Sequence, residues 1–443
     1  MTTLERNEIV TTIHSPGYIM VQKEAHQGWF WAAGHSIITG LGPGTLFAPL
    51  LVKLHGIHGA ILVAFLAALI TLAGQCLLSR LFGRFGGIHL EDIFDAAAAE
   101  PTYADVKMEP SHSKRKLLVG LGKVVDIILL LTVSAVSLTY LMVVAGQAAS
   151  VRSSERVEQA RIICLVVMLV ATLSFLKIVK RIWIDKIRPW TPYLTFFFCT
   201  LPTFVLILLA LGSSTGGAEK TGMQQLILEC TSFKRSLFSS RSLASGVGLA
   251  MFMLANYPHV GHIRSRCPQN NLSIFMVPMA VVVFPCFLIF SIGGWIIFDP
   301  ASVPFGIDIL TSASHTWPSY ITMRYIFAVD RLVAFIFLVD LAVGLLQKVF
   351  LCPKNRSETK LHVLRVAVSL VVGMMALICC HYLVPIITWS GLVLIGPLFL
   401  VIPAGISLFL RGEKSRHKIS SVCIIAAILI LMIGALLHGL VLY

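Results

Sequence analysis

Three glycines and a proline interrupt the first apolar stretch of the chain. Residues 28–52 are long enough to cross a bilayer, and Gly40, Gly42, Pro43 and Gly44 lie at their middle. A helix exposed to lipid must satisfy its own backbone hydrogen bonds, and this cluster of helix breakers prevents that. A broken helix is tolerated at that depth where it lines a polar cavity, because the freed N–H and C=O groups can then hold a solute. The pattern is typical of a transporter.

A second break is predicted in the apolar stretch 242–262, where Pro258 removes a backbone donor and clashes with the preceding turn. Half-helix N-termini at such breaks would face a substrate carboxylate, and unwound carbonyls a cation or ammonium. Alternatively, either proline only kinks a packed helix. The substrate-binding residues that we predict at the two breaks are Thr39, Gly40, Gly42, Gly44, Thr45, Asn256 and Tyr257.

Ionisable side chains inside apolar stretches are the remaining candidates for chemistry, because a charge at the centre of a membrane helix costs about 2.5–3.5 kcal/mol. Asp340 is the only acid that we find well inside an apolar run, in AFIFLVDLAVGLL. A structural carboxylate, hydrogen-bonded between helices, is the alternative interpretation. His35 and His259 could titrate near neutral pH and serve proton coupling, or could be ordinary packed histidines. We expect Arg324, Asp330 and Arg331 to extend to the exoplasmic interface.

The elements that must position these residues are eleven candidate membrane spans. They lie near 28–52, 57–79, 118–148, 162–178, 189–212, 242–262, 272–297, 320–347, 362–382, 384–410 and 420–442. With eleven spans, the five basic clusters all fall on the side of the N-terminus; they lie at 114–116, 177–188, 264–266, 348–365 and 411–418. Positive charge favours the cytoplasmic side, so we predict a cytoplasmic N-terminal tail at 1–27 and an exoplasmic C-terminus.

The composition agrees with an all-α integral membrane protein. The 443 residues are 57% hydrophobic and 13% charged, and the net charge is +14. A basic excess in such a chain collects in cytoplasmic loops, so we expect a lipid bilayer and no nucleic acid as partner. No motif for a cofactor, a metal or a catalytic nucleophile is present, so we predict no enzyme activity. Most of the ten cysteines lie in or beside spans, which predicts no structural disulfide.

Several short motifs resemble those of the amino acid/auxin permease family, in the amino acid-polyamine-organocation superfamily of transporters. Gly42, Gly44, Leu46 and Pro49 fit the pattern Gly-x-Gly-x-Leu-x-x-Pro with which that family opens. The other matches, in order along the chain, are Gly56 and Gly59, Tyr103 and Asp105, Tyr140, and Val260, Ile263 and Pro268.

The resemblance implies a LeuT-like fold, an inverted five-helix repeat in which helices 1 and 6 are broken. The single transporter domain would cover 28–442, with repeats near 28–212 and 242–410 and an extra helix near 420–442. In that fold span 8 packs near the break of span 1, which makes Asp340, with His259, a candidate ion-coupling residue. Tyr140 becomes a candidate substrate residue.

Two departures bear on the coupling ion. Ile38 stands where the sodium-coupled branch has an asparagine, and Tyr257 stands where many members have a histidine. The resemblance therefore implies transport of amino acids, usually neutral ones, and the buried acid favours a proton over sodium as coupling ion. The membrane could be the plasma membrane or an endomembrane. A transporter-like amino acid sensor is the second hypothesis, and an integral membrane enzyme is the third.

Overall fold

The structure is a computed structural model that describes 28–85, 93, 112–149, 161–169, 190–212, 240–254, 257–267, 272–298, 310, 319–350, 358–379, 382–409 and 415–442. Every regular element in these ranges is helical. Seven of the described helices are long and apolar enough to cross a bilayer, with windows of mean hydropathy between 1.9 and 2.8. The chain is therefore an all-α, multi-pass integral membrane protein. The predicted tail at 1–27 lies outside the described residues.

The first half of the chain contains α1 (Trp29–Gly40), η1 (Pro43–Phe47), α2 (Pro49–Phe85), α4 (His112–Ala149), α8 (Thr191–Thr195), η4 (Phe196–Thr200) and α9 (Leu201–Gly212). The second half contains α11 (Ser240–Met253), α12 (Pro258–Arg266), α13 (Ser273–Pro278), η5 (Met279–Val283), α14 (Phe284–Phe298), α16 (Ser319–Phe350), α17 (Glu358–Cys379), α18 (Leu383–Trp389), η7 (Ser390–Ile395), η8 (Pro397–Val401), α19 (Ile402–Phe409) and α20 (Ser415–Leu442).

Both predicted breaks are confirmed. The helix α1 ends at Gly40, and the chain continues through the 3-10 helix η1 before α2 begins at Pro49. In the other stretch α11 ends at Met253, and Pro258 occupies the first turn of α12, where its missing N–H has no cost. The turn into span 2 is made by Gly56, whose φ of +70° is open to glycine but strained for other residues.

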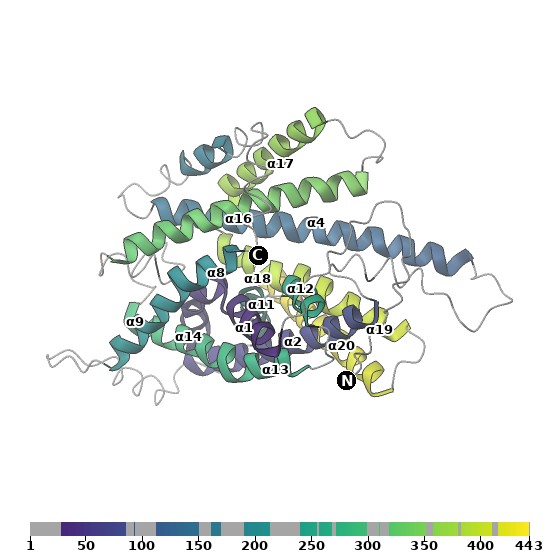
Figure 1. Ribbon diagram of the computed structural model, residues 1–443, viewed down its shortest axis with the longest axis horizontal. Coiled ribbons are helices and arrows are strands. Elements are labelled where there is room, and N and C mark those ends of the chain that lie inside the picture. The colour runs from purple at the N-terminus through teal and green to yellow at the C-terminus, as the bar shows by residue number, and fades with distance from the viewer. Residues whose placement is uncertain are drawn as a thin grey trace, which may run out of the picture.

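The helices form two groups. In Figure 1, α4 and α16 run side by side, with α17 packed on them, while most other helices gather below this layer. The broken helices lie in the lower group, where α1 packs against α12 and α13. The short helix α8 connects the groups, because it contacts both α16 and α1. The first broken helix is therefore linked to the upper layer through α8.

Two pairs of helix contacts are preserved when a predicted span is exchanged with the span five later. The helix α1 packs against α13, and α11 packs against α2; α8 and η4 pack against α16, and α18 and η7 pack against α4. Two structurally equivalent halves produce this pattern. The repeat boundaries at 28–212 and 242–410 remain predictions.

The predicted orientation can be tested by labelling with a membrane-impermeant thiol reagent. We expect the reagent to reach Cys230 from outside and not Cys352, because the basic clusters then share the cytoplasmic face. Both cysteines lie outside the described residues. Labelling of Cys352 from outside, or a glycan on Asn355, would reverse the orientation.

Candidate functional site

The two breaks meet at Gly44. A Cβ atom on Gly44 would lie 2.3 Å from the carbonyl oxygen of Met253 and 2.6 Å from its Cα. Met253 is the last residue of α11, directly before the second break. Glycine at position 44 thus allows the backbones of the two interrupted spans to touch. This contact brings the two sequence-predicted breaks together in space.

The first break satisfies part of its own backbone. The Gly42 carbonyl oxygen accepts hydrogen bonds from the Thr45 backbone N–H at 3.1 Å and from the Thr45 hydroxyl at 2.8 Å. The Thr39 hydroxyl donates to the His35 carbonyl oxygen at 2.8 Å. Both predicted threonines therefore support the local backbone, and Thr45 and Gly40 are buried. The shape of the break is held by short-range bonds encoded in the sequence.

Tyr257 begins the helix after the second break and is buried. Its ring stacks on Phe399 of η8, with the ring centroids 5.1 Å apart and the planes at 11°. A Cβ on Gly74 of α2 would lie 2.8 Å from the Tyr257 ring. Tyr257 is thus packed between α2 and η8, and its role in substrate binding remains a prediction. Asn256 lies outside the described residues.

A cluster of aromatic and imidazole rings joins α1, α8 and α12. His35 is buried, and its Nδ1 lies 2.7 Å from the Tyr193 hydroxyl. The rings of His259 and His262 each lie 5.7 Å from the His35 ring, centroid to centroid. Trp31 stacks on His35 and carries the Arg266 guanidinium on its face, 5.3 Å from the ring centroid. Hence His259, predicted for ion coupling, belongs to a three-imidazole contact between the two broken spans.

Asp340 is engaged by a neighbouring helix. Its carboxylate accepts a hydrogen bond from the Nε of Arg365 on α17 at 2.5 Å, and its side chain is 29% exposed. The helix α16 packs against η4, and η4 in turn packs against η1 of the first break. Asp340 therefore lies on the side of α16 that faces α17, and its predicted coupling role remains a prediction.

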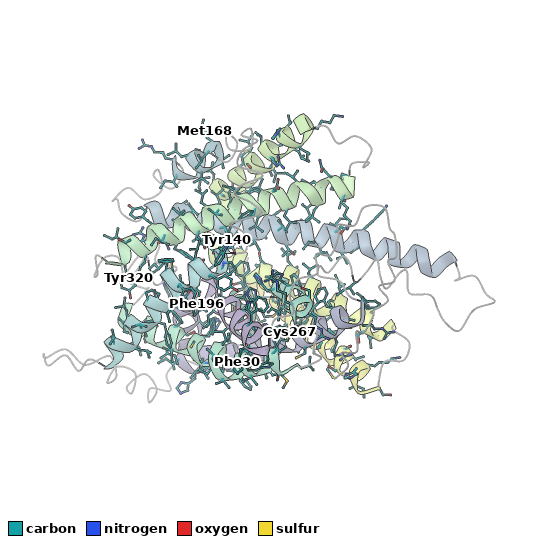
Figure 2. The ribbon with its side chains drawn as sticks, in the orientation of Figure 1. Phe30, Tyr140, Met168, Phe196, Cys267 and Tyr320 are labelled. Carbon is teal, nitrogen blue, oxygen red and sulfur yellow. The ribbon has the colours of Figure 1, made fainter. Side chains whose placement is uncertain are left out.

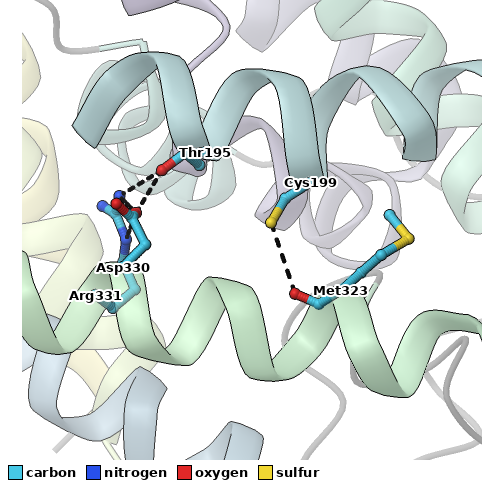
Figure 3. A network of polar contacts seen from close by, with 5 residues as sticks. All are labelled: Thr195, Cys199, Met323, Asp330 and Arg331. Atoms are coloured by element: carbon cyan, nitrogen blue, oxygen red, sulfur yellow. Dashed lines mark hydrogen bonds and ion pairs between the residues drawn. The ribbon is translucent and has the colours of Figure 1, made fainter. Parts of the chain in front are cut away.

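The expectation that Arg324, Asp330 and Arg331 reach the interface is wrong, because all three are buried. Arg324 donates from Nε to the Gln147 side-chain oxygen at 3.0 Å and also binds the Gln147 carbonyl oxygen in the last turn of α4. Asp330 and Arg331 form an ion pair with each other (Figure 3). Charges are stable inside the protein when they are paired or hydrogen-bonded. Here Arg324 finds its partner on α4, whereas Asp330 and Arg331 are partners within α16.

Tyr140 lies beside this ion pair. The Arg331 guanidinium lies over the Tyr140 ring, 4.7 Å from its centroid. Figure 2 places Tyr140 where α4 and α16 face the remaining helices. Tyr140 could be selected from the sequence, but its partner Arg331 could not, because the contact joins residues on different helices.

Comparisons with known proteins give distant structural likenesses. No family model and no curated protein matches the chain. A crystal structure of the Eremococcus coleocola manganese transporter, bound to an aromatic bis-isothiourea substituted compound, has a TM-score of 0.49 and 13% identity, covering 93% of this chain and 94% of that one. A Na⁺-coupled sialic acid symporter in its substrate-bound outward-open state has a TM-score of 0.46 and 14% identity, covering 93% and 89%. Likenesses at this level identify neither a family nor a substrate.

Proposed function

We propose that this protein is a secondary transporter that moves neutral amino acids across a membrane by alternating access, driven by a proton gradient. The observation that carries the proposal is the contact between the two interrupted spans at Gly44 and Met253. Interrupted helices at membrane depth expose backbone donors and acceptors that match the carboxylate and ammonium groups of an amino acid. The resemblance to the amino acid/auxin permease motifs, whose glycines include Gly42 and Gly44, supports the same substrate class.

The residues around the breaks support a proton as coupling ion. The Ile38 side chain supplies no oxygen for sodium beside the first break. His35, His259 and His262 form an imidazole cluster between α1 and α12, the halves of the broken spans that face the predicted cytoplasmic side. The coupling proton itself would be held by an aspartate of α16. The sequence suggested Asp340 for this role.

Uptake into proteoliposomes tests the proposal. Purified protein should concentrate one or more neutral amino acids from a labelled mixture when the inside is alkaline, and should only equilibrate them without a pH gradient. A sodium gradient at equal pH should not drive accumulation. Accumulation that requires sodium would refute proton coupling, and the absence of any protein-dependent uptake or exchange would refute amino acid transport.

A further inference from the structure

The ion pair formed by Asp330 and Arg331 is buried where α16 meets α8 and α4. Their side chains are 4% and 6% exposed. The Thr195 hydroxyl of α8, which is fully buried, donates to Asp330 Oδ2 and accepts from the Arg331 guanidinium at 3.0 Å. One turn further along, the Cys199 thiol lies 3.6 Å from the Met323 carbonyl oxygen, so the α8 side of the pair is closed by direct contacts (Figure 3). Thr195 therefore contacts both charged side chains of the pair.

The hydrogen bonds of the Asp330 carboxylate are unevenly distributed. The Thr195 hydroxyl and the Arg331 guanidinium both donate to Oδ2, and the Arg331 Nε lies 3.0 Å from it. Within the part of the chain that the structure describes, the buried Oδ1 has no hydrogen-bond partner. A carboxylate oxygen left without a donor in the interior is costly, and it is also a free position for a proton or another donor. The geometry therefore leaves one acceptor available beside a charged arginine.

Arg331 extends from this pair to Tyr140, one of the predicted substrate residues. Its guanidinium stacks on Tyr140 of α4 at 4.7 Å and on Phe327 at 5.4 Å. A planar guanidinium presents several N–H donors in a fork that matches a carboxylate. Asp330 occupies that fork here. A second carboxylate arriving beside Tyr140 would compete with Asp330 for the same donors.

We propose that the carboxylate of the transported amino acid and the coupling proton bind together at this pair, the carboxylate on Arg331 and the proton on Asp330. This inference rests on the function proposed above. An O–H bond forms on Asp330, the hydrogen bonds from Arg331 to Asp330 are replaced by hydrogen bonds to the substrate carboxylate, and no covalent bond breaks. The charge at the pair itself stays at zero, because the added proton balances the added carboxylate. The ammonium group of the amino acid is a separate charge, which unwound carbonyls at the breaks can accept.

The same charge balance requires the substrate carboxylate and the proton to bind together. A carboxylate that took Arg331 without a proton would leave Asp330 charged and unpaired in the interior, and a proton without a carboxylate would leave Arg331 unpaired. Each ligand therefore strengthens the binding of the other. Asp340 lacks this arrangement, because its side chain is more exposed and its arginine, Arg365, comes from α17 on the outer side of α16.

Three substitutions separate the two ligands in the full-length protein. Asp330→Asn keeps the shape and a hydrogen-bonding group but removes titration, so we expect exchange of substrate across the liposome membrane to continue while accumulation driven by a pH gradient is lost. Arg331→Gln should weaken binding of the amino acid about 10- to 100-fold and abolish the preference for it over its carboxamide analogue. The double variant removes both charges and guards against misfolding caused by an unpaired Arg331; it should fold, exchange substrate weakly and accumulate none.

Asp126→Asn is the matched control. Asp126 of α4 is also buried and pairs with Lys348 of α16 at 3.0 Å, across the same two helices. We expect this variant to accumulate substrate like the wild type. Calorimetry in two buffers of different ionisation enthalpy adds a second measurement: wild-type protein should take up a proton with each bound amino acid, and the Asp330→Asn variant should take up none.

The outcomes are distinguishable. A wild type that accumulates amino acids, together with an Asp330→Asn variant that accumulates them equally, overturns this inference and leaves the proposed function standing. Loss of accumulation in Asp340→Asn but not in Asp330→Asn overturns it in favour of Asp340. A wild type without protein-dependent amino acid uptake overturns the proposed function itself.

Discussion

Substitution of Gly44 by valine should abolish substrate binding and uptake while the protein still inserts into the membrane. A Cβ at this position would lie 2.3 Å from the Met253 carbonyl oxygen and 2.8 Å from the Met253 carbonyl carbon. Both are backbone atoms, so no rotamer change can relieve the overlap, and the two breaks would have to move apart. We expect transport to fall to background, measured by uptake in proteoliposomes and by binding of the transported amino acid in detergent.

The control is Gly34→Ala in the same span. A Cβ on Gly34 would have no atom of the described residues within 4 Å, and alanine favours the helix there. Gly42→Val should be less severe than Gly44→Val, because among the described residues its Cβ would meet only the Thr39 carbonyl oxygen, at 3.1 Å. Normal binding by both Gly42→Val and Gly44→Val would show that the first interruption is only a kink.

Substitution of Gly391 by alanine should lower the stability of the folded protein more than the other substitutions proposed for this chain. A Cβ there would lie 1.9 Å from the Gly248 carbonyl oxygen and 3.1 Å from the Phe252 backbone nitrogen. The helices α11 and η7 therefore touch through their backbones, and a methyl group would force them apart over their whole contact. We expect destabilisation of about 3 kcal/mol or more, measured as a lower thermal unfolding temperature in detergent.

Gly405→Ala is the matched control, because in the part of the chain that the structure describes a Cβ on Gly405 of α19 would have no atom within 4 Å. It should leave the unfolding temperature close to that of the wild type. If Gly391→Ala unfolds at the same temperature as Gly405→Ala, α11 and η7 do not pack as closely as the structure shows.

The breaks could be predicted from the sequence because their cause is local. Glycine and proline act on the backbone at their own positions, so the end of α1 at Gly40 and the start of α12 at Pro258 follow from residue type. The requirement for glycine at position 44 could not be predicted from residue type alone. It depends on Met253, more than 200 residues away, and on contact rather than on positive φ, which among the described glycines occurs at Gly56.

The charged residues of α16 show a second limit. Position along the span suggested that Asp330 and Arg331 lie at the interface and that Asp340 lies in the interior. The structure instead buries Asp330 and Arg331 against Thr195 and Tyr140, and pairs Asp340 with Arg365. Hydropathy reports depth along one helix, whereas burial depends on which helices are its neighbours. No local signal shows this burial, because adjacent positions on a helix do not ordinarily face each other and the contacts with Thr195 and Tyr140 come from other helices.

An experimental structure of the protein with its transported amino acid bound is the most direct test of whether the interrupted helices form the substrate site. We predict ligand density between the end of α1 at Gly40 and the start of α12 at Pro258, with the carboxylate oriented toward Arg331 beside Tyr140. Density for the amino acid at a place remote from both breaks, with Gly44 and Met253 still in contact, would contradict the central claim that the interrupted helices form the substrate site.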